Sequence, residues 1–467
     1  MPERLASALA DFSPVVPGRQ GRLDAMAAAT IRTVASPGAT PKLRHVREQA
    51  RPAAAALFLL ILLASAGDGF ADDERPGGAW VETWLQNRKL VQEWFGFRDT
   101  LVGWGITPSF RYATDLQANV LGGQRRGEAY AGEMFLDVDL DLGRLAGLTG
   151  LTFHVSGDWS SGTDLSADIG NFFSVAQYFE GNRTRLYTMF FQQSLFKGHL
   201  DMKVGRIATG DDFLTSPANV SLVNSALNPI LLAVQANVPS VTDEPHATWG
   251  GRVMIWPIAS LYVAAGAYYS DNTLDELRTD GTEFGIDTKH GYFVIGEVGY
   301  LLNYEKGATG LPGRYRAGGY YDSNRYTWFS DPDRQEQGNY GFFLLGEQMV
   351  YRESGSGSAQ GLTLFGAFVY APRQRINQLP WFASAGVSYT GLIPGRDKDA
   401  AAFAVYYGAF SQDLPGQTYE VALEWTYAIA VAPGLTVQPD IQYIMRPSGR
   451  SSIGNALVVG AQLSIQF

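Results

Sequence analysis

ALVVGAQLSIQF, residues 456–467, ends the chain, and its pattern decides the fold class. Two sets of side chains alternate along it: the apolar set is Leu457, Val459, Ala461, Leu463, Ile465 and Phe467, and the opposite set holds the polar Gln462, Ser464 and Gln466. Successive side chains of a strand point to opposite faces, so this strand has one apolar face and one polar face. The wall of a transmembrane barrel needs such strands, because lipid covers its outside and water its inside. A soluble sheet with one wet face gives the same pattern, so further strands are needed.

The composition excludes several classes of protein. Glycine supplies 53 of 467 residues and aromatic residues 13%, while the mean hydropathy is only -0.08, far below that of a helical membrane protein. After the apolar run 53–66, no stretch approaches the ~20 apolar residues of a membrane-spanning helix, so a membrane would be crossed by strands. The net charge of -10 argues against a nucleic-acid partner, which needs clustered cations. No cysteine is present, which excludes disulfides and thiolate chemistry.

The N-terminal region is typical of a secretory signal. Basic residues in 42–51 precede the apolar run 53–63 and the small residues 64–66. Cleavage is expected after Ala66 or Ala71, and the long upstream tail indicates a start codon assigned too early or an extended signal. We therefore predict that residues 1–71 are removed. Residues 72–105 should form a periplasmic segment with a short amphipathic helix, and residues 106–467 the barrel domain.

The pattern of residues 456–467 recurs along the chain and predicts an all-β fold, an antiparallel up-and-down transmembrane barrel of about sixteen strands. The predicted strands are 106–121, 129–143, 151–160, 184–196, 199–207, 247–256, 260–270, 290–304, 313–322, 338–351, 361–371, 380–391, 400–411, 417–431, 434–446 and 455–467. Short connections such as 197–198 and 257–259 alternate with longer ones such as 208–246 and 323–337. Bacterial barrels show this alternation between periplasmic turns and outer loops, and they have an even number of strands.

Four stretches resemble one family, the OprB-type carbohydrate-selective porins. They are Trp94–Asp99 with 101–107, 184–216, the loop residues 223–225 and 237–239, and the C-terminal 438–467. Phe95 departs from the glycine that the family places there, and the similarity spans about residues 89–467. The resemblance implies a sixteen-stranded porin in the outer membrane of a Gram-negative bacterium, which lets small sugars diffuse into the periplasm without a cofactor. It also implies inward-folded loops and a charged constriction.

Candidate pore-lining residues are polar side chains predicted to point into the barrel or to lie in its longest loop. They are Arg111, Asp115, Asp139, His154, Asp158, Lys203, Asp211, Asp212, Arg252, Glu297, Glu420 and Glu424. Carboxylates and guanidinium groups can bind sugar hydroxyls, and rings of such groups set selectivity in channels. We expect the loop 208–246 to fold into the lumen opposite Arg111 and Arg252, because loops this long are usually functional. The alternatives are solvated wall residues and an outer loop packed on its neighbours.

Two other chemistries fit the sequence poorly. Asp137-x-Asp139-x-Asp141 begins like a calcium loop, but Leu142 and Leu148 stand where glycine and glutamate are needed, so we predict no metal. A barrel lipase would need a converging triad. His154, Ser156 and Asp158 share one strand face and stand parallel, so no enzymatic activity is predicted.

The remaining predictions concern partners. Beside sugars and outer-membrane lipid, we expect the barrel-assembly machinery to recognise the terminal Phe467. A monomer and a trimer both remain open, as do the sugar and the alternative of a general, weakly selective porin.

Overall fold

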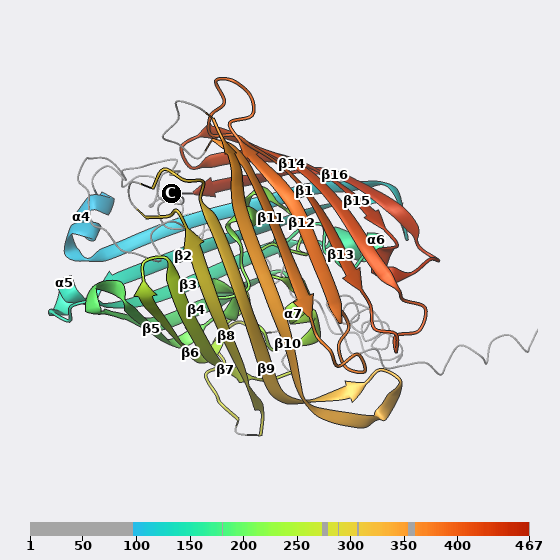
Figure 1. Cartoon of the computed structure of the whole chain (residues 1–467), viewed down its shortest axis with the longest axis horizontal. Coiled ribbons are helices and arrows are strands. Elements are labelled where there is room, and N and C mark those ends of the chain that lie inside the picture. The colour runs from blue at the N-terminus through green and yellow to red at the C-terminus, as the bar shows by residue number, and fades with distance from the viewer. Residues whose placement is uncertain are drawn as a thin grey trace, which may run out of the picture.

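A computed structural model describes residues 97–466 except 180, 273–278, 288, 306–307 and 354–359. Sixteen antiparallel strands form a closed barrel, in which each strand pairs with the next and β16 returns to β1 (Figure 1). The strands are β1 Ile106–Gly123, β2 Gly127–Asp141, β3 Leu151–Gly162, β4 Arg183–Leu195, β5 Leu200–Ile207, β6 Thr248–Ile258, β7 Leu261–Ser270, β8 Gly291–Leu302, β9 Gly313–Trp328, β10 Asp331–Arg352, β11 Gly361–Tyr370, β12 Trp381–Thr390, β13 Ala400–Ala409, β14 Tyr419–Ala432, β15 Leu435–Met445 and β16 Gly454–Gln466. The sixteen-stranded barrel predicted from the sequence is confirmed.

The closing strand β16 has the faces that its sequence predicts. Gln462 pairs with Asp115 of β1 and its side chain is buried inside the barrel, whereas Val459 is exposed on the outside. Because Arg111 pairs with Gln466, β1 begins and β16 ends at the same end of the barrel, which we call the terminal end. The opposite end is the loop end. Phe467 lies outside the described residues.

One predicted connection is wrong. Residues 323–337 were expected to form a long loop, but β9 and β10 continue through most of this region and leave only a two-residue turn, Phe329-Ser330. The charged run Asp331–Glu336 has no apolar alternation and therefore resembles a loop in sequence, whereas an antiparallel pair needs only backbone hydrogen bonds. The paired strands reach past their neighbours at the loop end (Figure 1).

Helices are few and short. They are α4 Phe97–Trp104, α5 Leu142–Ala146, α6 Leu165–Ile169 and α7 Leu232–Asn237, with 3₁₀ turns η1 Phe196–Gly198, η2 Thr209–Asp211, η3 Pro217–Ser221 and η5 Pro447–Gly449. The helix α4 precedes β1, as predicted for residues 72–105, and the rest of that segment lies outside the described residues. Among the described residues, no helix is long and apolar enough to span a bilayer.

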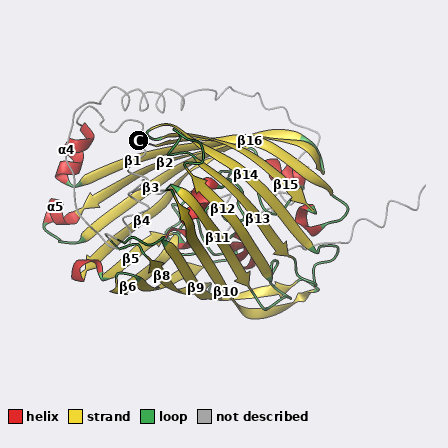
Figure 2. Ribbon diagram, turned by 45° about the horizontal axis from the view of Figure 1, so that its top comes forward, coloured by secondary structure: helices red, strands yellow, loops and turns green. Residues whose placement is uncertain are grey.

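Two connections at the loop end fold into the barrel. The first joins β3 to β4 and contains α6, and the second joins β5 to β6 and contains η2, η3 and α7 (Figure 2). We call the described residues of these segments, 163–179, 181–182 and 208–247, the plug. Their buried apolar side chains pack against the inner wall in one cluster, which includes Leu165, Ile169, Phe173, Leu222, Leu231 and Val234 from the plug and Tyr262, Phe293, Phe343, Phe382 and Tyr406 from the wall.

The hydrophobic core of this protein therefore lies inside its barrel. Fully burying one such side chain stabilises a fold by about 1.5–3 kcal/mol, so a cluster of this size holds the plug as a folded part of the molecule. The prediction that the loop 208–246 folds inward is confirmed, and 163–182 is a second inward segment that the sequence reading had not identified.

Candidate pore site

Two glutamates on β14 fix the plug to the wall. Glu420 accepts hydrogen bonds from the backbone N–H groups of Phe172 (2.7 Å) and Phe173 (2.8 Å). Glu424 accepts from the N–H groups of Val223 (2.5 Å) and Asn224 (3.1 Å). Both glutamates are fully buried, at 0% exposure. They point inward as predicted, but they anchor the plug and do not line a pore, because the plug covers them.

Two aspartates among the predicted pore residues are covered as well. Asp115 accepts from the side-chain amide of Gln462 at 3.0 Å and is 1% exposed. Asp158 forms a buried ion pair with Arg185, whose Nη1 lies 3.2 Å from the carboxylate. Both aspartates are almost fully buried against neighbouring wall residues, so neither lines an open pore, in contrast to the expectation from the sequence.

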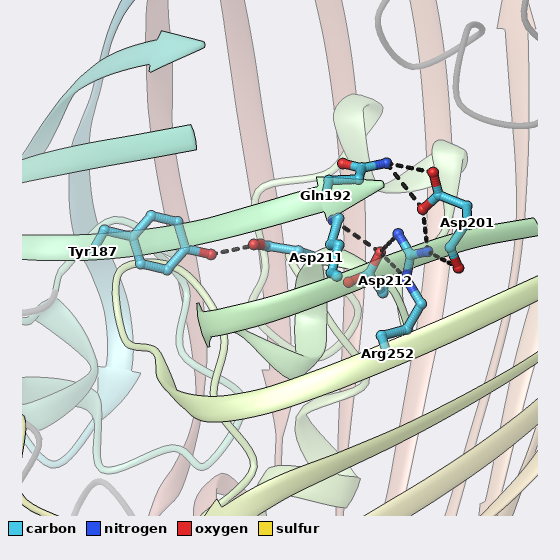
Figure 3. Close-up of polar contacts among 7 residues, drawn as sticks. Tyr187, Gln192, Asp201, Asp211, Asp212 and Arg252 are labelled. Carbon is cyan, nitrogen blue, oxygen red and sulfur yellow. Dashed lines mark hydrogen bonds and ion pairs between the residues drawn. The ribbon is translucent and has the colours of Figure 1, made fainter. Parts of the chain in front are cut away.

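The wall formed by β4, β5 and β6 carries a different arrangement, a cluster of compensated charges (Figure 3). One oxygen of Asp212, a plug residue, accepts from Lys203 Nζ at 3.0 Å and from Arg252 Nε and Nη2 at 3.1 and 2.9 Å. Arg252 also binds the carboxylate of Asp201. The amide of Gln192 donates to both oxygens of Asp201 at 2.9 and 2.8 Å. Plug and wall thus share one network, which we call the charge cluster.

Aromatic rings lie beside the charge cluster. The hydroxyl of Tyr187 donates to Asp211 at 2.5 Å, and the edge of its ring meets Phe135 at 5.8 Å between centroids. Lys203 Nζ lies 5.0 Å from the centre of the Phe190 ring. Such contacts between cations and rings stabilise both groups. Phe135, Tyr187 and Phe190 are at most 7% exposed at this inner surface, so they pack against the charged groups and offer little open ring face.

Arg111 extends this surface to β1. Its guanidinium lies 4.5 Å from the centre of the Phe135 ring and forms an ion pair with Glu244 of the plug. The Arg111 side chain keeps 31% of its exposure and that of Glu244 keeps 24%, so water reaches this pair. As expected from the sequence, Arg111 and Arg252 face the plug loop.

His154 and Asp139 lie nearer the terminal end. His154 Nδ1 is 2.7 Å from Asp139, and the imidazole ring stacks on Phe190 at 4.8 Å. Asp139 keeps 52% of its side-chain exposure. This pair therefore continues the polar and aromatic surface of the charge cluster toward the terminal end.

Glu297 belongs to a separate group on β7, β8 and β9. It accepts from the Tyr262 hydroxyl at 2.5 Å and lies 3.8 Å from Arg316 Nη1. Both side chains of the ion pair are almost fully buried. Glu297 therefore belongs to the packed interior.

Desolvation and neighbouring charges shift the pKa values of two plug residues, Asp211 and Asp212. Desolvation by the surrounding protein raises the pKa of Asp211 to about 6, although the residue keeps an exposed surface and the Lys203 cation and the Tyr187 hydroxyl oppose the shift. Burial would also raise the pKa of Asp212, but Lys203 and Arg252 outweigh it and hold this pKa below its ordinary value. At neutral pH both aspartates are ionised. Lys203, Arg252 and Arg111 then face four carboxylates, those of Asp201, Asp211, Asp212 and Glu244.

The aromatic residues of this surface, together with Asp201 and Gln192, are not among the pore residues predicted from the sequence. A register shift between β3 and β4 explains part of this: Val155 pairs with Met189, but Gly157 pairs with Leu186. An extra residue in one strand turns the following side chains to the other face. Tyr187 and Phe190 can therefore both point inward, although strict alternation puts them on opposite faces. The apolar residues in 163–182 were the available signal for the second plug segment.

A closed sixteen-stranded barrel with inward-folded loops and a charge cluster on its inner wall defines a porin-type channel. Residues 125–467 match the model of the carbohydrate-selective porin, OprB family, and the chain belongs to that family. It is 26% identical over 470 residues to Porin B of Pseudomonas aeruginosa, covering 91% of this chain and 100% of the relative. It is 23% identical over 427 residues to a protein of Acinetobacter baylyi named putative porin QuiX, covering 82% of this chain and 94% of that relative.

The solved structures agree with the fold. The high-pH structure of Pseudomonas putida OprB superposes with a TM-score of 0.75 at 25% identity, covering 82% of this chain and 99% of that chain.

Proposed function

We propose that this protein is an outer-membrane porin through which small, uncharged sugars diffuse passively into the periplasm. The observation that carries this proposal is the near balance of charge where plug and wall meet. The three cations Lys203, Arg252 and Arg111 form ion pairs there with three carboxylates. A fourth carboxylate, that of Asp211, accepts from the Tyr187 hydroxyl, and Phe135 and Phe190 lie beside this group. Balanced charges offer many hydrogen-bond donors and acceptors to hydroxyl groups and attract neither cations nor anions strongly.

The partly exposed polar groups give the same site its second property. A sugar's hydroxyl groups can exchange water for Arg111, which keeps 31% of its side-chain exposure, or for Asp139, which keeps 52%. The carboxylates of Glu244 and Asp139 keep 24% and 52% of their side-chain exposure, so they remain acceptors that a solute can reach. Contacts of this kind are weak enough to release the sugar, which passive transport requires.

Liposome swelling tests the proposal. Full-length protein reconstituted in phosphatidylcholine liposomes should admit glucose faster than a polyol or hexose of matched size but different hydroxyl geometry. Equal rates for all of them would support the alternative, a general porin that separates solutes by size alone. Swelling no faster than that of protein-free liposomes would contradict transport itself.

The contacts favour transport over catalysis. His154 binds Asp139, whereas Asp158 binds Arg185, so the residues that could form a hydrolytic triad are engaged with different partners. We infer that the terminal end faces the periplasm and the loop end the exterior, as in barrels with short periplasmic turns. Assembly through Phe467 and the choice between monomer and trimer stay predictions.

A further inference from the structure

A small cavity lies at the loop end, outside the charge cluster. It has a volume of about 40 Å³, is partly open, and lies between the starts of β4 and β6, the end of β7 and the last residues of the plug. The residues that matter for its chemistry are Arg185, Arg206, Thr242, His246, Thr248 and Asp271. It has room for about three water-sized groups, since one water needs roughly 10–15 Å³ of such space.

Arg206 is the unusual member of this cavity. Only 7% of the residue is exposed, and its guanidinium donates to two backbone carbonyls, those of Ala247 at 3.0 Å and Glu283 at 3.1 Å. Its Nε is buried without a hydrogen-bond partner among the described residues. The Glu283 carboxylate is near enough to act on it electrostatically, but it accepts from the Gly281 N–H instead and forms no ion pair with Arg206.

The other charges of the cavity have partners. Arg185 is paired with Asp158 at 3.2 Å, and Asp271 lies 3.0 Å from His290 Nδ1. Among the charged groups whose ion pairs are described, Arg206 therefore adds one positive charge with no carboxylate bound to it. A buried charge without a counter-ion is costly, and carbonyl oxygens compensate it only in part.

We propose that this cavity binds a small oxyanion, a carboxylate or phosphate group, with the Arg206 guanidinium as its principal ligand. The enclosed space fits a carboxylate, which has three heavy atoms, and because the cavity is partly open a phosphate can enter with some of its oxygens left in water. The neighbouring Thr242 hydroxyl accepts from the Thr209 N–H at 3.3 Å and can donate its own proton to the anion. Two sources offer this group: a soluble sugar acid or sugar phosphate, and the phosphate of a lipid in the outer leaflet.

Binding by the folded full-length protein in detergent tests the proposal. Isothermal titration with inorganic phosphate and with glucuronate should give one site per chain. Arg206→Gln should weaken this binding by about tenfold or more, because a charge-assisted contact is lost. Arg206→Lys should retain part of it. Arg450→Gln is the matched control, since Arg450 is an exposed cation at the same end of the barrel and should leave the affinity unchanged.

A second arm of the experiment distinguishes the two sources of the anionic group. It uses vesicles that contain lipid A in place of the soluble anions. If glucuronate and phosphate bind and compete with each other for one site, the ligand is a soluble anion. If only the lipid A vesicles bind, and Arg206→Gln abolishes that binding, the ligand is the lipid. Failure of all three probes, or equal binding by Arg206→Gln, would overturn the proposal. Sugar-driven swelling and the heat-dependent gel mobility of Arg206→Gln should match those of the wild type, which shows that the variant is folded and separates this site from the sugar pathway.

Discussion

Two regions of the inner wall carry carboxylates on inward-facing positions, and they use them differently. On β14, Glu420 and Glu424 are fully buried and accept hydrogen bonds from the backbone of the plug. Across β2 to β6, Asp139 and Asp201 keep part of their exposure and bind side chains instead of the plug backbone. The plug covers the region around Glu420 and Glu424, whereas it leaves Asp139 and Asp201 partly exposed. A carboxylate under the plug is a structural anchor, and a carboxylate at its edge is available to a solute.

Removing part of the plug should have the largest effect. Deletion of residues 217–236 takes away η3, most of α7 and much of the apolar cluster, while the strands keep all their backbone pairing. We expect a several-fold increase in single-channel conductance, because the cross-section open to ions grows. Planar-bilayer recording measures it, with heat-dependent gel mobility to verify that the barrel is closed. Unchanged conductance would show that this segment does not obstruct the channel.

Substitution of an anchoring glutamate on β14 should have the next largest effect. Glu424→Ala leaves the N–H groups of Val223 and Asn224 and the Tyr406 hydroxyl without their acceptor. Each buried group left unsatisfied costs about 1–3 kcal/mol, so the plug should loosen. The expected result is a noisier channel and faster proteolysis at the plug. Glu424→Gln keeps one acceptor oxygen, so its channel noise and its rate of proteolysis should lie between those of Glu424→Ala and the wild type.

A substitution in the charge cluster should change selectivity more than stability. Arg252→Gln leaves Asp201 and Asp212 with Lys203 as their remaining cation, so the pore should favour cations. The zero-current potential in a KCl gradient measures this preference. Sugar-driven swelling should fall by roughly threefold to tenfold, as expected when a charge-assisted hydrogen bond is lost. Arg252→Lys, which retains the charge but not the planar fork, should recover the ion selectivity and only part of the sugar flux.

The smallest effect concerns pH. Because desolvation by the surrounding protein raises the pKa of Asp211 to about 6, this residue loses its negative charge as the pH falls from 7.5 to 5. Its carboxylate is the one negative charge in excess of the three cations, so the weak preference for cations that it gives should decline over this range, and Asp211→Asn should already show the reduced preference at pH 7.5. The folded state holds the proton more tightly than the unfolded chain does, so this group makes the plug more stable, not less, as the pH falls. An identical pH response in Asp211→Asn would assign the titration to another group.

The same comparison separates what the sequence determines from what the tertiary structure decides. Strand alternation is a local property, and β16 and β1 could be placed and oriented from their own residues. The inward direction of Glu424 and Arg252 follows from the same rule. The family could be recognised because its motifs are contiguous in the chain.

Only the tertiary structure decides which inward residues meet the plug. Glu424 binds Val223, 201 positions away, and nothing in the sequence near either residue specifies that contact. A bulge in β4 turns both Tyr187 and Phe190 inward. Its position depends on how β4 pairs with β3, so the sequence of β4 alone does not specify it. Alternation assigns a face to each residue, whereas burial depends on how a long loop packs, and that packing is the sum of many nonlocal contacts.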